Sequence, residues 1–588
     1  MINRRAAIAL AAASTLAVQT SWAATSEPQS TPDTAFAALS QRALAHWIAV
    51  SPITATFQGD HHLDAELDDL SPAGRAKALA GSQRLLAELD RIDVARLSRE
   101  NQVDAAILRN QLRYDVWGWQ DSQDWAWDPQ VYGQAAGNAL YNLMAREFAP
   151  LPERLGNAVT RMEKLPAFLA QARANLDPAR VPRVHAETVA KQNGGLLSLV
   201  DEFIAPHLGS LPEAERKRAD AAIAGLKAAV AEHQQWLDKT LVPNAKGDFR
   251  IGAKLYDQKL QFALMSSLSR AEIRARAEKG IDEARAEMYR IARGLVKDLP
   301  AEPTAEQQQS GIEAALELAY AERPKRDAVV ADATATLKQA RQFLIDKDLI
   351  TVPSDPVRII TMPEFQQGVA VAYCDSPGPL DVGQPTFYAV SPIPKDWSDA
   401  QVDSFLREYN SRMIHLLSIH EGIPGHYLEG AVTARFPSTL RAFLRSGLFA
   451  EGWAVYGERM MRESGYLDND PLFHLVQLKF YLRTMANAIL DQGVHVEGWT
   501  RDQAMDLMMR RTFQQEREAA GKWVRAQLSS AQLPTYFVGV QEQLDMREAV
   551  RAAWGSKFTL KAYHDAVLSH GAPPVRFTRE LLLNEPIR

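Results

Sequence analysis

The segment that most constrains this chain runs from His420 to His426 and reads His-Glu-Gly-Ile-Pro-Gly-His. Two histidines with a glutamate directly after the first are typical of zinc hydrolases. Both imidazoles bind the metal, and the glutamate takes a proton from the attacking water. The usual spacing of four residues sets both histidines on one face of a helix. Here His426 follows His420 by six positions, which on a regular helix turns the second ring by about 120°.

Two glycines and a proline between the histidines resolve this mismatch. Pro424 has no N–H and disfavours helical backbone at Ile423. Gly422 and Gly425 tolerate backbone conformations that other residues avoid. We therefore predict a bulge or a short break within Gly422–Gly425 that lets both rings face one ion. Such a break costs stability, which is typical of functional sites.

A second motif, Glu-Gly-Trp-Ala-Val-Tyr-Gly-Glu, spans residues 451–458 within a predicted helix over residues 443–462. Glu451 is a natural third ligand, because two histidines and one carboxylate leave one position of zinc open for water. Glu458 lies about two helical turns further on, on the same face, and is a candidate for orienting a histidine ligand. The predicted ligands of Zn²⁺ are His420, His426 and Glu451.

The segments HEGIPGHYLE and EGWAVYGERM resemble the two signature motifs of the domain-of-unknown-function 885 family. These bacterial proteins are regarded as zinc-peptidase-like and related to the zinc peptidases that use a glutamate ligand. The resemblance covers most of the chain and includes RMEKLPAFLAQARANL in the first half and AYHDAVLSHGAPPV near the end. It implies a large, mainly helical zinc-peptidase-like fold with a deep cleft. Tyr427 departs from the family pattern, because a second consecutive histidine is common at that position.

The predicted catalytic residues are Glu421, as general base and then acid, and Tyr536. The resemblance implies Tyr536, because related helical zinc peptidases steady the oxyanion with a tyrosine or histidine downstream of the glutamate ligand. Tyr536 lies in Pro534–Gly539, a shortened version of a stretch that ends in Tyr-x-x-Gly in the family. Further candidates for the same role, each of which could equally be structural, are His495, Arg483 and Arg525.

Apolar residues recur at helical spacing between charged faces over most of the chain. Runs of β-branched and aromatic residues bounded by Pro, Gly and Asp predict three strands, at residues 357–362, 369–373 and 386–391. The predicted helices cover residues 33–50, 72–90, 98–118, 152–176, 184–204, 212–240, 268–297, 304–320, 326–346, 399–420, 443–462, 470–492, 501–528, 535–553 and 560–569.

These elements predict a mainly α-helical protein with a small β-sheet near the metal helix. Residues 1–23 form a predicted signal peptide, because two arginines precede an apolar run that ends in Ser-Trp-Ala, with cleavage near Ala23. We expect a periplasmic or secreted protein. Residues 24–350 form an N-terminal helical half, and residues 351–588 form the small sheet plus the metal-binding helical half. The two halves together make one catalytic unit.

The net charge and the hydropathy argue against a nucleic-acid partner and against a transmembrane segment. The net charge of −6 gives no sign of the basic face that a nucleic acid needs. The sequence has no run of eighteen or more apolar residues, so we predict no transmembrane segment. Three other polar residues are expected to be solvated rather than metal-bound, namely His61, His62 and Glu429.

The expected function is that of an exported zinc-dependent hydrolase that cleaves amide bonds of peptides or peptide-like substrates. One alternative is a non-catalytic helical binding protein with a structural zinc site. Structural sites are closed by four protein ligands, so three good ligands favour the enzyme. Another alternative is a metal hydrolase that acts on a non-peptide amide or ester, and the sequence does not decide between these substrates.

Overall fold

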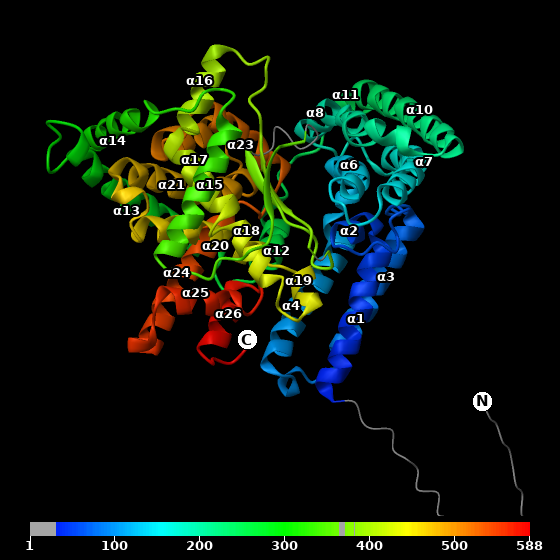
Figure 1. Cartoon of the computed structure of the whole chain (residues 1–588), viewed down its shortest axis with the longest axis horizontal. Helices are drawn as coiled ribbons and strands as arrows, with labels where there is room; N and C mark the ends of the chain where they lie inside the picture. Colours follow the sequence, from blue (N-terminus) through cyan, green and yellow to red (C-terminus); the bar gives the residue numbers. More distant parts are fainter. Residues whose placement is uncertain (1–30, 364–370, 382) are drawn as a thin grey trace, which may run out of the picture.

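The computed structural model describes residues 31–363, 371–381 and 383–588, so the predicted signal peptide lies outside the described residues. The protein is mainly helical with one small sheet, as predicted. Figure 1 shows the first helices, coloured blue to teal, on one side of the view and most helices from α13 onward on the other. The strands lie between the two groups. No helix in the described ranges is long and apolar enough to cross a membrane.

Within the described residues, fifteen α-helices precede the sheet, joined by turns and by short 3₁₀- and π-helical segments. Those before residue 250 are α1 Pro32–Val50, α2 Pro52–Phe57, α3 Pro72–Leu89, α4 Arg99–Trp117, α5 Asp124–Trp127, α6 Gln130–Met144, α7 Leu151–Asn175, α8 Arg183–Gln192, α9 Gly195–Leu199, α10 Glu213–Trp236 and α11 Val242–Asn244. The next four are α12 Gly252–Leu264, α13 Arg270–Leu295, α14 Ala305–Tyr320 and α15 Val329–Asp346.

Helices resume after the sheet. They are α16 Asp399–Glu408, α17 Ser411–Leu417, α18 His426–Thr433, α19 Thr439–Phe443, α20 Gly447–Glu463, α21 Pro471–His495, α22 Arg501–Met505, α23 Glu516–Leu528, α24 Pro534–Trp554, α25 Leu560–Leu568 and α26 Val575–Leu582.

Side-chain caps explain where the predictions held and where they failed. Ser269 and Glu272 form a capping box at the start of α13, within two residues of the predicted start. The single helix predicted over residues 399–420 is wrong. Asn410 accepts hydrogen bonds from the backbone N–H groups of Arg412 and Met413, and this cap starts α17 as a new helix. The predicted helices 184–204 and 501–528 are interrupted as well.

The sheet has the strand order β1-β3-β2, with β1 Val357–Thr361, β2 Ala372–Asp375 and β3 Thr386–Val390. β1 pairs parallel to the central strand β3, and β2 pairs antiparallel to it. All five residues of β3 are buried. The first and third predicted strands are confirmed, whereas the second begins later than predicted, and residues 364–370 lie outside the described residues. β2, at the edge, contacts the π-helix η7 Ser418–Gly422.

Two large hydrophobic clusters fill the interior. One takes its residues from Leu70 to Ala245 and includes the facing sides of α6, α7 and α10. The other takes its residues from Tyr256 to Val575. It surrounds η7, α20, α21 and α24 with buried apolar side chains, so these elements are held by packing on several sides.

His61 joins the N-terminal helices to the loop before β3. Its Nδ1 lies 3.0 Å from Asp64 and its Nε2 lies 3.1 Å from Asp381, and its ring stacks on Phe148 at 3.6 Å. The prediction that His61 is solvated is therefore wrong, whereas His62 keeps 90% of its side chain exposed. Burial lowers the pKa of His61, but the hydrogen bonds to Asp381 and Asp64 outweigh burial and raise the pKa to about 9.

This contact should make stability depend on pH. Because the pKa of His61 is higher in the folded protein, its contribution is complete below about pH 6.5 and is lost as pH rises through about 9. We expect His61→Gln to lower the free energy of unfolding by about 1–3 kcal/mol near pH 6, and by much less above pH 10. Melting temperatures measured across this range test the idea, with His62→Gln as the exposed control. A deficit that stayed constant with pH would contradict it.

Candidate metal site

The predicted break between the two histidines is confirmed. α17 runs into η7, which carries His420. Ile423 is extended, with φ −132° and ψ 123°, and α18 begins at His426. A Cβ atom on Gly425 would lie 1.9 Å from the carbonyl oxygen of His420, so only glycine fits at this close approach. The chain thus leaves one helix and enters another between the two rings.

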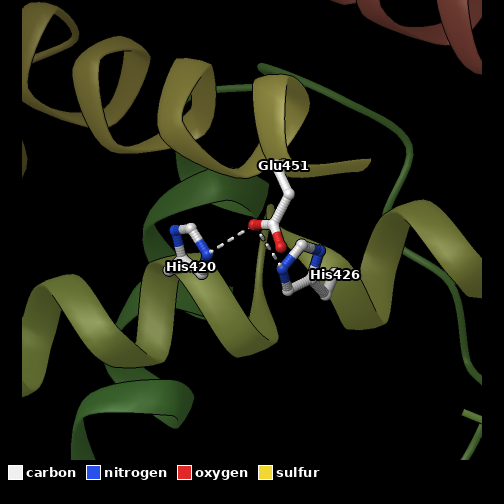
Figure 2. Close-up of side chains that lie close together, drawn as sticks. All are labelled: His420, His426 and Glu451. Carbon is white, nitrogen blue, oxygen red and sulfur yellow. Dashed lines mark ion pairs between the residues drawn. The ribbon is translucent and has the colours of Figure 1, made fainter. Parts of the chain in front are cut away.

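The break brings both rings to one carboxylate oxygen. Figure 2 shows Glu451 extending from α20 between the two imidazoles. Its Oε2 lies 3.4 Å from Nε2 of His420 and 3.5 Å from Nε2 of His426. The three ligand atoms lie within 4.8 Å of one another. No other group of three such donors occurs in the described ranges.

This geometry fits a zinc ion. Bonds of about 2.0–2.1 Å at tetrahedral angles place ligand atoms roughly 3.3–3.4 Å apart, close to the two separations measured here. These separations are longer than a typical N–H···O hydrogen bond, and Oε2 of Glu451 is buried without a hydrogen-bond partner. A cation bound between the three ligand atoms would satisfy this oxygen. Burial raises the pKa of Glu451, but the adjacent imidazoles outweigh burial and hold it well below its usual range.

Glu458 orients His420 as predicted. Its carboxylate is fully buried, and Oε1 lies 2.7 Å from Nδ1 of His420. With Nδ1–H donating to Glu458, Nε2 is left as the metal-binding atom of the ring. Burial raises the pKa of Glu458 to about 7, despite the hydrogen bond with His420. Burial lowers the pKa of His420, but Glu451 and Glu458 outweigh it and raise the pKa well above its usual value. Metal binding should therefore release a proton from this group.

Glu421 is a largely buried glutamate beside the candidate metal ligands in the chain. It follows His420 in η7 and is 8% exposed. Its carboxylate makes no hydrogen bond or ion pair with any other residue that the structure describes. Its negative charge raises the pKa of His420, the residue before it in the chain. Both oxygens are therefore available to accept a proton.

Tyr536 also lies at this site. Its ring is parallel to that of His420 to within 25°, with centroids 6.4 Å apart. Its helix, α24, crosses α20 at two glycines. A Cβ atom on Gly452 would lie 2.4 Å from the carbonyl carbon of Gly539, so the two backbones are in contact. This contact brings Tyr536 close to Glu451, the residue before Gly452.

The other candidates for oxyanion stabilisation have different surroundings. Nε2 of His495 donates to the carbonyl oxygens of Ala526 and Ser529, each at 2.8 Å, so His495 is a buried structural residue. Arg483 forms an ion pair with Glu518. Arg525 donates to the hydroxyl of Tyr536 at 3.3 Å and therefore lies at the edge of the site.

Two residues near the motif differ from expectation or from the family pattern. Glu429 is fully buried and ion-paired with Arg445, so the prediction that it is solvated is wrong. Its position one turn after His426 gave no sign of this partner, which lies beyond the next helix. Tyr427 donates its hydroxyl to the carbonyl oxygen of Asp355 at 2.6 Å. It therefore has a structural hydrogen bond where the family commonly has a histidine.

Comparison with known proteins agrees with the motifs. Residues 52–582 match the model of the family described as bacterial proteins of unknown function, DUF885. The chain therefore belongs to the DUF885 family. No curated protein matches the chain.

Two solved structures share the fold over nearly their whole length. One is a protein from Shewanella oneidensis, described as a candidate lipoprotein of unknown function. It is 33% identical, the match covers 93% of this chain and 99% of that one, and the TM-score is 0.78. The other is described as a candidate lipoprotein from Colwellia psychrerythraea. It is 18% identical, with 94% and 99% covered and a TM-score of 0.74. At 18% identity, the second structure is evidence of a shared fold only.

The glycine contact between α20 and α24 predicts a stability effect. We expect Gly452→Ala to lower the free energy of unfolding by about 1–3 kcal/mol, because the added methyl group must push the two backbones apart. Gly521→Ala, in α23, is the matched control, since a Cβ atom there meets nothing within 4 Å. Alanine should be neutral or stabilising at that position. Equal melting temperatures for the two variants would show that the helices separate without cost.

Proposed function

We propose that this protein is an exported zinc-dependent hydrolase that cleaves amide bonds of peptides or peptide-like substrates. The observation that carries the proposal is the convergence of His420, His426 and Glu451 beside Glu421, whose carboxylate has no hydrogen-bond partner among the described residues. A zinc ion held by the three residues would polarise the substrate carbonyl and lower the pKa of a water molecule to about 7.

The roles of the protein groups follow from their positions. Glu421 accepts the proton of the attacking water and returns it to the leaving nitrogen, because its free carboxylate follows a ligand directly in the chain. Tyr536 donates its hydroxyl to the oxygen that becomes negative in the transition state. Glu458 keeps His420 in the orientation that metal binding requires.

Access to the site is consistent with catalysis. The side chains of His426 and Glu451 keep 14% and 18% of their surface exposed, so small molecules can reach them. Among the described residues, the edge strand β2 pairs with β3 alone and lies against η7, so a peptide in extended form could pair with its outer edge. We also propose that the site lies in a deep cleft of the kind found in zinc peptidases. The protein would be exported through the predicted signal peptide.

The number of donors favours an enzyme over a structural zinc site. A structural site is normally closed by four protein ligands, whereas the group found within the described ranges has three. Glu458, the nearest further carboxylate, contacts the opposite ring nitrogen of His420 and does not face the ion. One coordination position therefore stays available for water or substrate.

Metal binding and catalysis can be separated by substitution. Glu421→Gln should retain stoichiometric zinc and normal melting, because glutamine keeps the size of the side chain and loses only its basic oxygen. Its turnover on a peptide library should fall by roughly 10²- to 10⁴-fold. His420→Ala and Glu451→Ala should lose zinc and the stability that it contributes. Metal analysis beside the cleavage assay tests this. Normal turnover by Glu421→Gln would show that another group is the base.

The role of Tyr536 predicts a different pattern. Tyr536→Phe removes only the hydroxyl, so zinc content should not change, whereas kcat should fall by roughly 10²- to 10³-fold with little change in KM. Tyr427→Phe is the control, because the hydroxyl of Tyr427 is bound to the carbonyl oxygen of Asp355. If both variants turned over like the wild type, the oxyanion would have to be stabilised elsewhere.

A further inference from the structure

Two basic side chains beside the candidate site, Lys522 and Arg525, have no anionic partner among the described residues. Lys522 and Arg525 lie three residues apart on α23 and therefore share one face of that helix. Lys522 is 5% exposed and makes no hydrogen bond or ion pair with any residue in the described ranges. Arg525 donates only to neutral groups, the amide oxygen of Gln532 at 3.1 Å and the hydroxyl of Tyr536 at 3.3 Å.

The carboxylates that act on these two side chains, Glu518 and Glu451, already have other partners. Glu518 forms an ion pair with Arg483 and accepts a hydrogen bond from Tyr409 at 2.8 Å. Glu451 acts electrostatically on both Lys522 and Arg525, but its charge belongs to the proposed zinc site. Burial, together with Arg483 and Arg525, holds the pKa of Lys522 well below its usual range. Without a bound anion these surroundings favour the neutral amine of Lys522, and a carboxylate bound between Lys522 and Arg525 would favour its ammonium form.

A buried charge without a partner is costly, and proteins rarely keep one unless a ligand completes it. An ammonium group and a guanidinium on one face can bind the two oxygens of a carboxylate, since arginine offers paired N–H donors and lysine a compact charge. The position fits a substrate group. Arg525 contacts Tyr536, whose ring centroid is 6.4 Å from that of His420.

We propose that Lys522 and Arg525 bind a carboxylate carried by the substrate. Because an extended residue spans about 3.3–3.6 Å, the carboxylate lies roughly one to three residues from the bond that is cleaved. The preferred substrates are therefore short peptides with a free C-terminus near the scissile bond, or peptides with an acidic side chain at that position. This inference rests on the proposed function for its reaction, but the carboxylate site can be tested without hydrolysis.

The first test compares substrates. Zinc-loaded wild-type protein is given one peptide library in three forms: with a free C-terminal carboxylate, with a C-terminal amide, and as an amide with Asp or Glu near the end. We expect at least one carboxylate form to be cleaved with a kcat/KM roughly 10- to 100-fold above the plain amide. The form that is preferred identifies the source of the carboxylate. Equal cleavage of all three forms would overturn the proposal.

The second test compares variants. Lys522→Met keeps the length of the side chain and removes its charge, so the preference for the carboxylate form should be lost while zinc content and cleavage of the plain amide stay unchanged. Its melting temperature should be equal or higher, because a buried amino group without a hydrogen-bond partner is gone. A purely structural lysine would instead lower the melting temperature and both activities together. Arg517→Met is the control, because Arg517 is exposed on the same helix and lies over the ring of Trp397.

The third test measures binding alone. 2-Benzylsuccinate carries two carboxylates, one for the metal and one for the cations, whereas 3-phenylpropionate lacks the second. Calorimetry on the zinc-loaded protein should show roughly 10- to 100-fold tighter binding of the first compound, and Lys522→Met should remove the difference. Preserved binding without peptide cleavage would refute the proposed function and leave the carboxylate site standing. Peptide cleavage that Lys522→Met leaves unchanged, with no difference in binding, would support the proposed function and refute the carboxylate site.

Discussion

The close approach of α20 and α24 positions two of the residues in the site, Glu451 and Tyr536. At Gly452 and Gly539 the two helices touch through their backbones, which no larger side chain would allow. Glu451 directly precedes one of these glycines, and Tyr536 lies one turn before the other. The same contact therefore sets both the carboxylate and the phenol against the rings of His420 and His426. Buried apolar side chains around the crossing hold it in place.

Charge is distributed unevenly around this crossing. Glu451 and Glu458 contact the imidazole of His420, and Glu421, the residue after His420, has no hydrogen-bond partner among the described residues. On the side of α23 the balance is reversed, because Lys522 and Arg525 meet no carboxylate of the described chain. A cation bound by His420, His426 and Glu451, together with an anion bound by Lys522 and Arg525, would balance the charge on both sides. The zinc peptidase that we propose, acting near a substrate carboxylate, would bring these two ligands together.

Local sequence signals were strong for the elements and for the metal group. Helical periodicity placed α3, α7, α14 and α24 within a few residues of their ends, because caps and apolar faces act over a few residues. The break at Gly422–Gly425 was readable because proline and glycine restrict or release the backbone locally. The division at Asn410 was missed, since asparagine caps one helix but is also common on helix surfaces.

The sequence by itself determined a mainly helical chain of the DUF885 family, the break between two histidines, and the spacing that makes Glu458 a partner of His420. Only the tertiary structure decided which distant residues meet. It set Arg525 against Tyr536, gave His495 a structural role, buried Glu429 against Arg445, and left Lys522 without a partner among the described residues. The physical reason is that burial and ion pairing depend on helix crossings between segments far apart in the chain, and periodicity within one helix carries no information about them.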